Sequence, residues 1–152
     1  MKRILMVTTG ALACAVGTAA IASAQGAVSA HTSSTAKVEL RHTSLGSILT
    51  TSSGLTLYMF THDRNGENSC VKIHECAKFW PAFDTSGTPL AGPGVQRSLL
   101  STIRVSGSEQ VTYAGHALYT FSEDKPGSTA YVGVKEFGGN WDALSAAGHA
   151  VK

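Results

Sequence analysis

The chain has 152 residues, of which 12 are Lys or Arg and 10 are Asp or Glu, giving a formal net charge of +2. This length fits one domain and argues against a multidomain enzyme. The near-neutral charge argues against a nucleic-acid partner held by bulk positive charge, and the 16 glycines favour a turn-rich protein over a helical bundle.

The first 24 residues have the pattern of a secretory signal peptide. Lys2 and Arg3 precede an apolar run over residues 4–21, and Ala22-Ser23-Ala24 forms a small-residue cleavage site. Cleavage there leaves a neutral chain of 128 residues outside the cytoplasm. Lipid anchoring at Cys14 is a less favoured alternative, because the large and small residues before it stand in the reverse of the lipoprotein order. No later stretch approaches the ~20 apolar residues of a membrane-spanning helix.

The most informative feature of the mature chain is an internal repeat. The sequence Leu-Tyr-Met-Phe-Thr-His-Asp at residues 57–63 recurs as Leu-Tyr-Thr-Phe-Ser-Glu-Asp at residues 118–124, an offset of 61. Held without gaps, this offset gives eleven identities over 34 aligned positions. We therefore expect a flexible linker over residues 25–44, followed by a duplicated domain whose repeats span about 45–88 and 99–149.

Both repeats contain runs that are typical of β-hairpins. We expect residues 47–51 to pair with residues 55–60, and residues 110–113 to pair with residues 117–121. A third hairpin is expected between residues 99–105 and the run that begins at Gln110. The predicted fold is mostly β, a single domain of two tandem, pseudo-symmetric, hairpin-based repeats with short helical turns.

The run that ends at Phe60 alternates between two kinds of side chain. Leu57 and Met59 fall on one face of the strand, and Tyr58 and Phe60 fall on the other. Because both faces are apolar, this strand is expected to be central and covered on both sides. Further along the chain, residues 75–80 predict one short helical turn.

Asp63 and Asp124 form the first candidate site. Equivalent carboxylates near a pseudo-twofold axis suit a metal site or an acid–base site. Each aspartate also begins an Asp-x-x-Gly sequence, in which the carboxylate accepts N–H groups of its own turn. Local turn chemistry is the favoured interpretation because it accounts for both residues.

The repeated aromatic residues form the second candidate site. Tyr58, Phe60, Tyr119 and Phe121 suit a surface platform for a sugar, a haem or a peptide. Aromatic residues that alternate along a strand belong more often to a core, and the two tryptophans are natural packing partners. Burial in the core, against Trp80 and Trp141, is therefore the favoured interpretation.

The two cysteines of the mature chain form the third candidate site. An even pair in an oxidising compartment usually forms a disulfide, so we expect a Cys70–Cys76 bond. The alternative is a zinc or copper site of Cys70, His74 and Cys76 with His62 and Met59 nearby, because these side chains are suitable soft ligands. Their spacing matches no closed zinc module, and no cofactor is expected.

Motifs of catalytic and nucleotide-binding sites are not found in the sequence. No serine stands in a Gly-x-Ser-x-Gly sequence, and Gly92-Pro93-Gly94 lacks the Lys-Ser or Lys-Thr that follows a phosphate-binding loop. The sequence therefore predicts a protein that is not an enzyme.

The repeat motif carries a family resemblance. Leu-Tyr-x-Phe-x-x-Asp at residues 57–63, with the later Cys-Ala-x-x-Trp-Pro at residues 76–81, resembles the bacterial family called secreted repeat of unknown function. The second half resembles it as well, from Gln110 through the second Tyr-x-Phe-x-x-Asp sequence to Phe-Gly-Gly-x-Trp at residues 137–141. Members are also described as predicted lipoproteins. The motif residues in this chain are Tyr58, Phe60, Asp63, Trp80, Tyr119, Phe121, Asp124 and Trp141.

This chain departs from the family pattern at three points. Ala82 and Ala117 stand where prolines are usual, and five residues separate Cys70 from Cys76 where about three are expected from the resemblance. The resemblance implies export and a duplicated β-rich module, and it supplies no activity.

Taken together, these observations predict a secreted or cell-envelope protein that is a non-enzymatic binding or structural module. Its partner is expected to be an envelope or extracellular ligand, without nucleic acid and without a transmembrane segment after signal cleavage. The alternative is an extracytoplasmic redox or metal-handling protein that uses His62, Cys70, His74 and Cys76.

Overall fold

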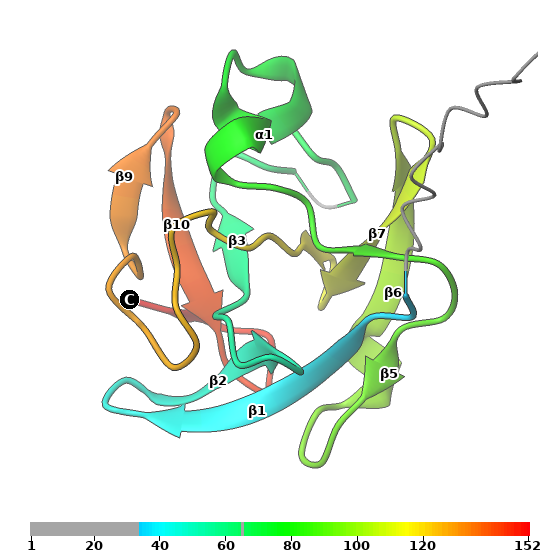
Figure 1. The fold of residues 1–152 in the computed structure, drawn as a ribbon, viewed down its shortest axis with the longest axis vertical. Helices are drawn as coiled ribbons and strands as arrows, with labels where there is room; N and C mark the ends of the chain where they lie inside the picture. Colours follow the sequence, from blue (N-terminus) through cyan, green and yellow to red (C-terminus); the bar gives the residue numbers. More distant parts are fainter. Residues whose placement is uncertain (1–33, 65) are drawn as a thin grey trace, which may run out of the picture. The chain divides into compact units, whose positions relative to one another are not determined.

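Strands dominate the computed structural model, which describes residues 34–64 and 66–152 (Figure 1). The expected signal peptide over residues 1–24, including Cys14, lies outside the described residues. The strands in chain order are β1 Lys37–Thr43, β2 Gly46–Thr51, β3 Tyr58–Phe60, β4 Asp84–Thr85, β5 Leu90–Ala91, β6 Leu100–Val105, β7 Ser108–Tyr113, β8 His116–Ala117, β9 Val134–Glu136, β10 Gly139–Leu144 and β11 Ala150–Val151. The helical elements are short: η1 Cys70–Lys72, α1 Cys76–Phe79 and η2 Arg97–Leu99.

Each repeat begins with a long antiparallel hairpin. In the first repeat β1 pairs with β2, and in the second β6 pairs with β7. Ser106 and Gly107 make the tight turn of the second hairpin, with φ angles of 49° and 92°. The hairpin predicted for residues 99–105 and 110–113 is therefore confirmed.

Strand β1 corrects the predicted linker. Residues 37–43 pair with β2 from Val38 to Thr43, so the linker expected over residues 25–44 is wrong for this segment. Only two apolar residues, Val38 and Leu40, alternate here, which makes the strand a weak sequence signal. The buried Val38 side chain fixes β1 against the core. The linker residues before position 34 lie outside the described residues.

The hairpin predicted between residues 47–51 and 55–60 is much shorter than expected. The two runs share one bridge, Thr50 with Thr56, and the hydrogen bonds that flank it. Beyond this point the chain leaves β2, and β3 pairs with β10 of the second repeat instead. The equivalent hairpin of the second repeat, β7 with β8, forms as predicted but pairs only as far as Ala117.

The two repeats exchange equivalent contacts around a pseudo-twofold axis. Tyr58 and Tyr119 donate backbone N–H groups to each other's carbonyl oxygens, both at 2.9 Å. Tyr58 also pairs with Ala143 of β10, and Tyr119 bridges to Ala82, which is the counterpart of Ala143 at the 61-residue offset. Strand β3 is therefore flanked on both sides, as predicted, and it lies at the centre of the described residues (Figure 1).

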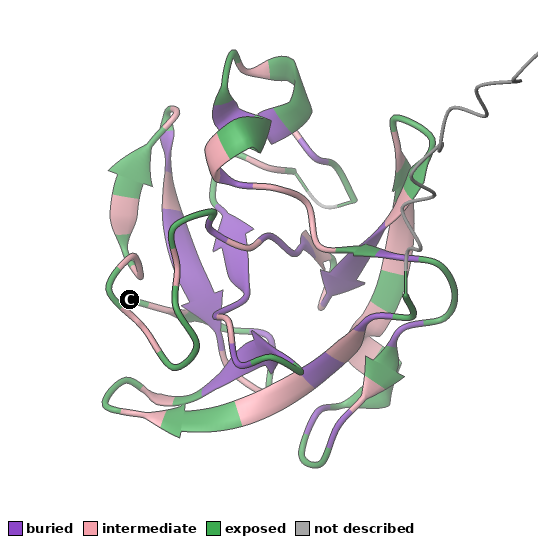
Figure 2. Ribbon diagram, in the orientation of Figure 1, coloured by how far each residue is buried: buried purple, intermediate pink, exposed green. Residues whose placement is uncertain are grey.

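Side chains on the two faces of this central segment enter two hydrophobic clusters. Leu57 and Met59 pack into a cluster with Leu118, and Tyr58 and Phe60 pack into the second cluster. The predicted alternation is therefore confirmed. Figure 2 shows β3 and most of β10 as buried, while β1 is buried only along part of its length. The second cluster positions the candidate site because it contains most of the family-motif residues.

Candidate functional site

Each repeat donates a tyrosine hydroxyl to the aspartate of the other repeat. The Tyr119 hydroxyl donates to Asp63 Oδ2 at 2.7 Å, and the Tyr58 hydroxyl donates to Asp124 Oδ2 at 2.9 Å. Both tyrosines are fully buried. Desolvation raises the pKa of each tyrosine far above its ordinary value, and the aspartate beside each raises that pKa further. The two hydroxyls are therefore constant hydrogen-bond donors that join the repeats.

The carboxylates have partners beyond their own turns. Asp63 Oδ1 accepts the backbone N–H of Ser69 at 2.8 Å and the Ser69 hydroxyl at 2.5 Å. Asp124 Oδ1 accepts the backbone N–H of Lys125 at 3.0 Å, a bond inside its own turn. The prediction that local turn chemistry accounts for both aspartates is therefore wrong for Asp63, whose described partners connect separate segments of the chain. For Asp124 it holds only in part, because this carboxylate also accepts the Tyr58 hydroxyl.

The motif aromatics stack into a column in the interior. Trp80 and Trp141 lie face to face, with ring centroids 4.0 Å apart and planes 4° apart. Phe60 stacks on the outer face of Trp141 at 4.1 Å, and Phe121 packs against Trp80 at 4.5 Å. All four side chains are buried. We call these four residues the aromatic column. Because Tyr58 and Tyr119 are buried together with Phe60 and Phe121, the surface platform is ruled out.

The two ends of the aromatic column differ. At one end the exposed imidazole of His62 stacks on Phe60 at 5.6 Å. At the other end Tyr131, which is half-buried, packs on Phe121 at 4.1 Å. The column therefore reaches solvent through an imidazole on one side and through further aromatic side chains on the other.

A cavity of about 290 Å³ lies at the Tyr131 end. We call it the aromatic pocket, and its lining residues are Phe79, Phe121, Glu123, Tyr131, Glu136 and Phe137. Phe79 comes from α1 of the first repeat, and the other five come from the second repeat, so the pocket lies where the repeats meet. Phe79 and Phe137 face each other with centroids 6.3 Å apart.

Sequence reasoning missed the aromatic pocket because it followed the identities between repeats. At the 61-residue offset Tyr131 aligns with Cys70 and Phe137 aligns with Cys76, while the nearby Val and Glu residues are identical. The pocket-lining aromatics thus stand where the first repeat carries its disulfide. The sequence signal that points to the pocket is this replacement of two cysteines in the first repeat by two aromatic residues at the aligned positions of the second.

Glu136 is held in place by the aromatic column. The indole N–H of buried Trp80 donates to Glu136 Oε2 at 3.1 Å. The counterpart contact is missing from the described residues, where the indole nitrogen of buried Trp141 has no hydrogen-bond partner. Glu75, the residue aligned with Glu136, instead pairs with Lys78 at 3.2 Å on the surface. Only one of the two equivalent glutamates is therefore oriented by a tryptophan.

The cysteines are joined as predicted. Cys70 and Cys76 form a disulfide, with Cα atoms 5.3 Å apart and both side chains fully buried. The bond removes both thiolates from the alternative metal site. The described residues contain no group of three or more His, Cys, Asp or Glu side chains that is arranged to hold a metal ion. His62 and His74 of the alternative site are therefore not part of such a group.

Reduction of this disulfide is expected to lower the free energy of unfolding by roughly 2 kcal/mol, because the bond closes a short loop in the unfolded chain. Urea denaturation of the mature protein with and without reductant measures the change. The Cys70→Ser, Cys76→Ser double variant is the matched comparison, and it should not respond to reductant. An unchanged midpoint on reduction would show that the disulfide contributes nothing to stability.

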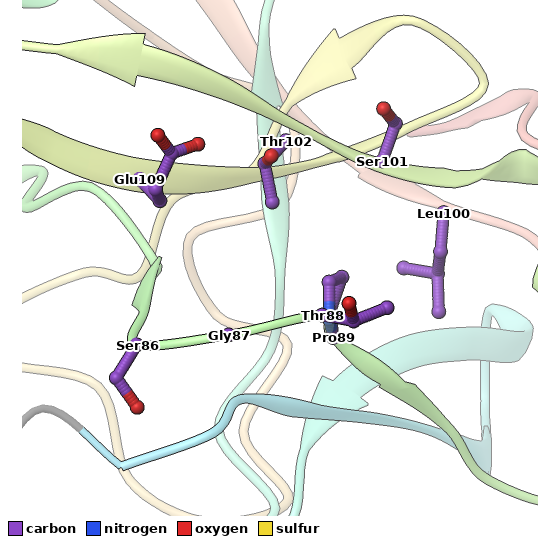
Figure 3. Close-up of a pocket in the computed structure, with 8 residues that line it drawn as sticks. All are labelled: Ser86, Gly87, Thr88, Pro89, Leu100, Ser101, Thr102 and Glu109. Carbon is purple, nitrogen blue, oxygen red and sulfur yellow. The ribbon is translucent and has the colours of Figure 1, made fainter.

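A larger hollow of about 400 Å³ lies between the loop over residues 86–89 and strands β6 and β7. Figure 3 shows Ser86 to Pro89 on one side and Leu100, Ser101, Thr102 and Glu109 on the other. Its polar groups are mainly hydroxyls, and Glu109 already pairs with Arg104 at 3.3 Å. No residue predicted from the sequence as a candidate site lines it, and it contains no aromatic side chain.

Comparison with known proteins agrees with the repeat structure. The family described as secreted repeat of unknown function matches twice, at residues 40–84 and 101–145. No curated protein and no solved structure matches the chain. Within residues 34–64 and 66–152, no helix has the length and apolar character needed to cross a membrane. The two matches share the 61-residue offset and together cover more than half of the sequence, so the chain belongs to the family of secreted repeats of unknown function.

Proposed function

We propose that this protein is a non-enzymatic binding module outside the cytoplasm, and that the aromatic pocket is its ligand site. The observation that carries the proposal is a cavity of about 290 Å³ lined by four aromatic side chains and two carboxylates. Cavities with apolar walls and a few placed polar groups are typical ligand sites. The ligand is expected to be an envelope or extracellular compound and not a nucleic acid.

The non-enzymatic part of the proposal is supported by the roles of the two motif aspartates. Asp63 and Asp124 are the pair that best suited acid–base chemistry, and both carboxylates accept hydrogen bonds from buried tyrosines. A carboxylate that carries structural hydrogen bonds is costly to free for proton transfer. Glu123 and Glu136 of the pocket then serve in recognition.

Amide NMR of the isotopically labelled mature protein tests the proposal. The probe is a fragment panel that spans neutral, cationic and anionic compounds. Fragments that bind are expected to shift the amides of Phe79, Tyr131 and Phe137, and Phe137→Ala is expected to weaken this binding about tenfold or more through lost aromatic contact. Thr102→Ala, in the hydroxyl-lined hollow, is the matched control and should leave the affinities unchanged.

Two results would overturn the proposal. One is a set of binding fragments whose shifts lie away from the aromatic pocket and survive Phe137→Ala. The other is chemical conversion of a bound fragment during prolonged incubation, seen as new resonances in the fragment spectrum, because a binding module leaves its ligand unchanged.

A further inference from the structure

We infer that the aromatic pocket recognises a quaternary ammonium group, an inference that rests on the proposed function and names the class of its ligand. The charges of the lining residues give the first argument. Glu123 and Glu136 are the two acidic lining residues, and the lining contains no Lys, Arg or His. A cavity with two carboxylates and no lining cation favours a positively charged ligand.

The aromatic walls give the second argument. The face of an aromatic ring attracts a cation through the ring quadrupole, and this attraction strengthens where water is excluded. Phe79 and Phe137 face each other across 6.3 Å, and Tyr131 packs on Phe121 beside them. The protein already uses one of these rings for a cation, because the Lys78 ammonium lies 5.2 Å from the centroid of the Phe79 ring.

The fixed carboxylate gives the third argument. The buried Trp80 indole orients Glu136 through Oε2, at 3.1 Å, which leaves the other carboxylate oxygen available to a ligand. This carboxylate is therefore positioned before a ligand arrives, so less conformational entropy is lost on binding. The aligned Glu75 has no such support and pairs with Lys78 on the surface.

The balance of aromatic and polar groups selects among cations. A primary ammonium carries three N–H donors and needs acceptors for them when it leaves water. A quaternary ammonium carries no N–H donor and needs only apolar contact and nearby negative charge. Four of the six lining side chains are aromatic, so most of the wall offers contact without hydrogen-bond acceptors. The shared chemistry is that of a free choline-type compound and of a choline lipid headgroup.

Choline and 3,3-dimethylbutan-1-ol, in which a carbon replaces the charged nitrogen, form the decisive pair of probes. Amide NMR titrations are expected to give choline an affinity at least about tenfold higher than that of the neutral isostere. Glu136→Gln is expected to remove most of this preference. Glu109→Gln is the matched control, because it removes a carboxylate of the hydroxyl-lined hollow that also pairs with a basic side chain, Arg104, and it should leave the choline affinity unchanged.

Equal affinities for the two probes would overturn this inference while the proposed binding function stands. Failure of choline alone, with other fragments bound in the pocket, would have the same meaning. Failure of every fragment would overturn both. If choline binds, a second experiment sediments the protein with phosphatidylcholine vesicles. Co-sedimentation that free choline inhibits identifies a lipid headgroup as the ligand, and no co-sedimentation identifies a free compound. Both results support the inference.

Discussion

Replacing Trp80 with alanine is expected to lower the free energy of unfolding by about 3–5 kcal/mol, the range for a large aromatic side chain lost from a core. Trp80 is fully buried, and it stacks on Trp141 at 4.0 Å and packs against Phe121 at 4.5 Å. The edge contact with Tyr58, at 5.1 Å, is lost as well. Urea denaturation followed by circular dichroism measures the change. A loss of less than about 1 kcal/mol would contradict the central role of the aromatic column.

Phenylalanine variants of the two tryptophans test the difference in the hydrogen bonding of their indole N–H groups. Trp80→Phe removes an indole N–H that donates to Glu136, whereas Trp141→Phe removes one that has no partner among the described residues. We therefore expect Trp80→Phe to be the more destabilising change, by about 1 kcal/mol. These variants keep an aromatic ring in the column, so the comparison remains possible if the alanine variants do not fold. Equal losses would show that the Glu136 contact does not contribute.

Replacing Asp63 with alanine is expected to lower the free energy of unfolding by about 3 kcal/mol, because three hydrogen-bond donors lose their acceptor. The donors are the Tyr119 hydroxyl and the backbone and side chain of Ser69. Tyr119→Phe removes one of these donors together with its need for a partner, so its expected cost is smaller, about 1 kcal/mol.

A double-mutant cycle isolates the bond between the repeats. Asp63→Ala and Tyr119→Phe are expected to couple by about 1–2 kcal/mol, because both remove the same buried hydrogen bond. The equivalent cycle with Tyr58 and Asp124 provides an internal repetition of the measurement. Glu67→Ala, at an exposed position, is the control and should change stability by about 0.5 kcal/mol or less. Strict additivity in both cycles would contradict the proposed link.

Local sequence patterns predict part of this fold, although they miss β1 and the short strands of both repeats. The alternation of Leu57 to Phe60 assigns each side chain to the correct hydrophobic cluster, since the period of a strand fixes which residues share a face. The β6–β7 hairpin follows from a turn that only a few residue types adopt easily, with Ser106 and Gly107 at positive φ. The pairing of β3 with β10 was not predictable, because no local signal states which distant strand a run will join.

The candidate site was less predictable than the fold. Identity between the repeats points to Asp63 and Tyr119, and these side chains hold the two halves together. The aromatic pocket depends on Tyr131 and Phe137, which differ from their aligned cysteines and so fall outside any list of repeated residues. Its existence also depends on Phe79 approaching from the other repeat, a contact that only the three-dimensional structure specifies.

The reciprocal contacts between the halves have the form of an isologous interface, in which each partner offers the same surface to the other. Tyr58 meets Tyr119 backbone to backbone, and each tyrosine finds its carboxylate in the opposite half. A chain with one repeat would therefore need a second copy of itself to complete these bonds. When both repeats lie in one chain, their sequences can differ, so the two halves need not be symmetric. Here the first half is closed by the Cys70–Cys76 disulfide, while the second half carries Tyr131 and Phe137 at the aligned positions.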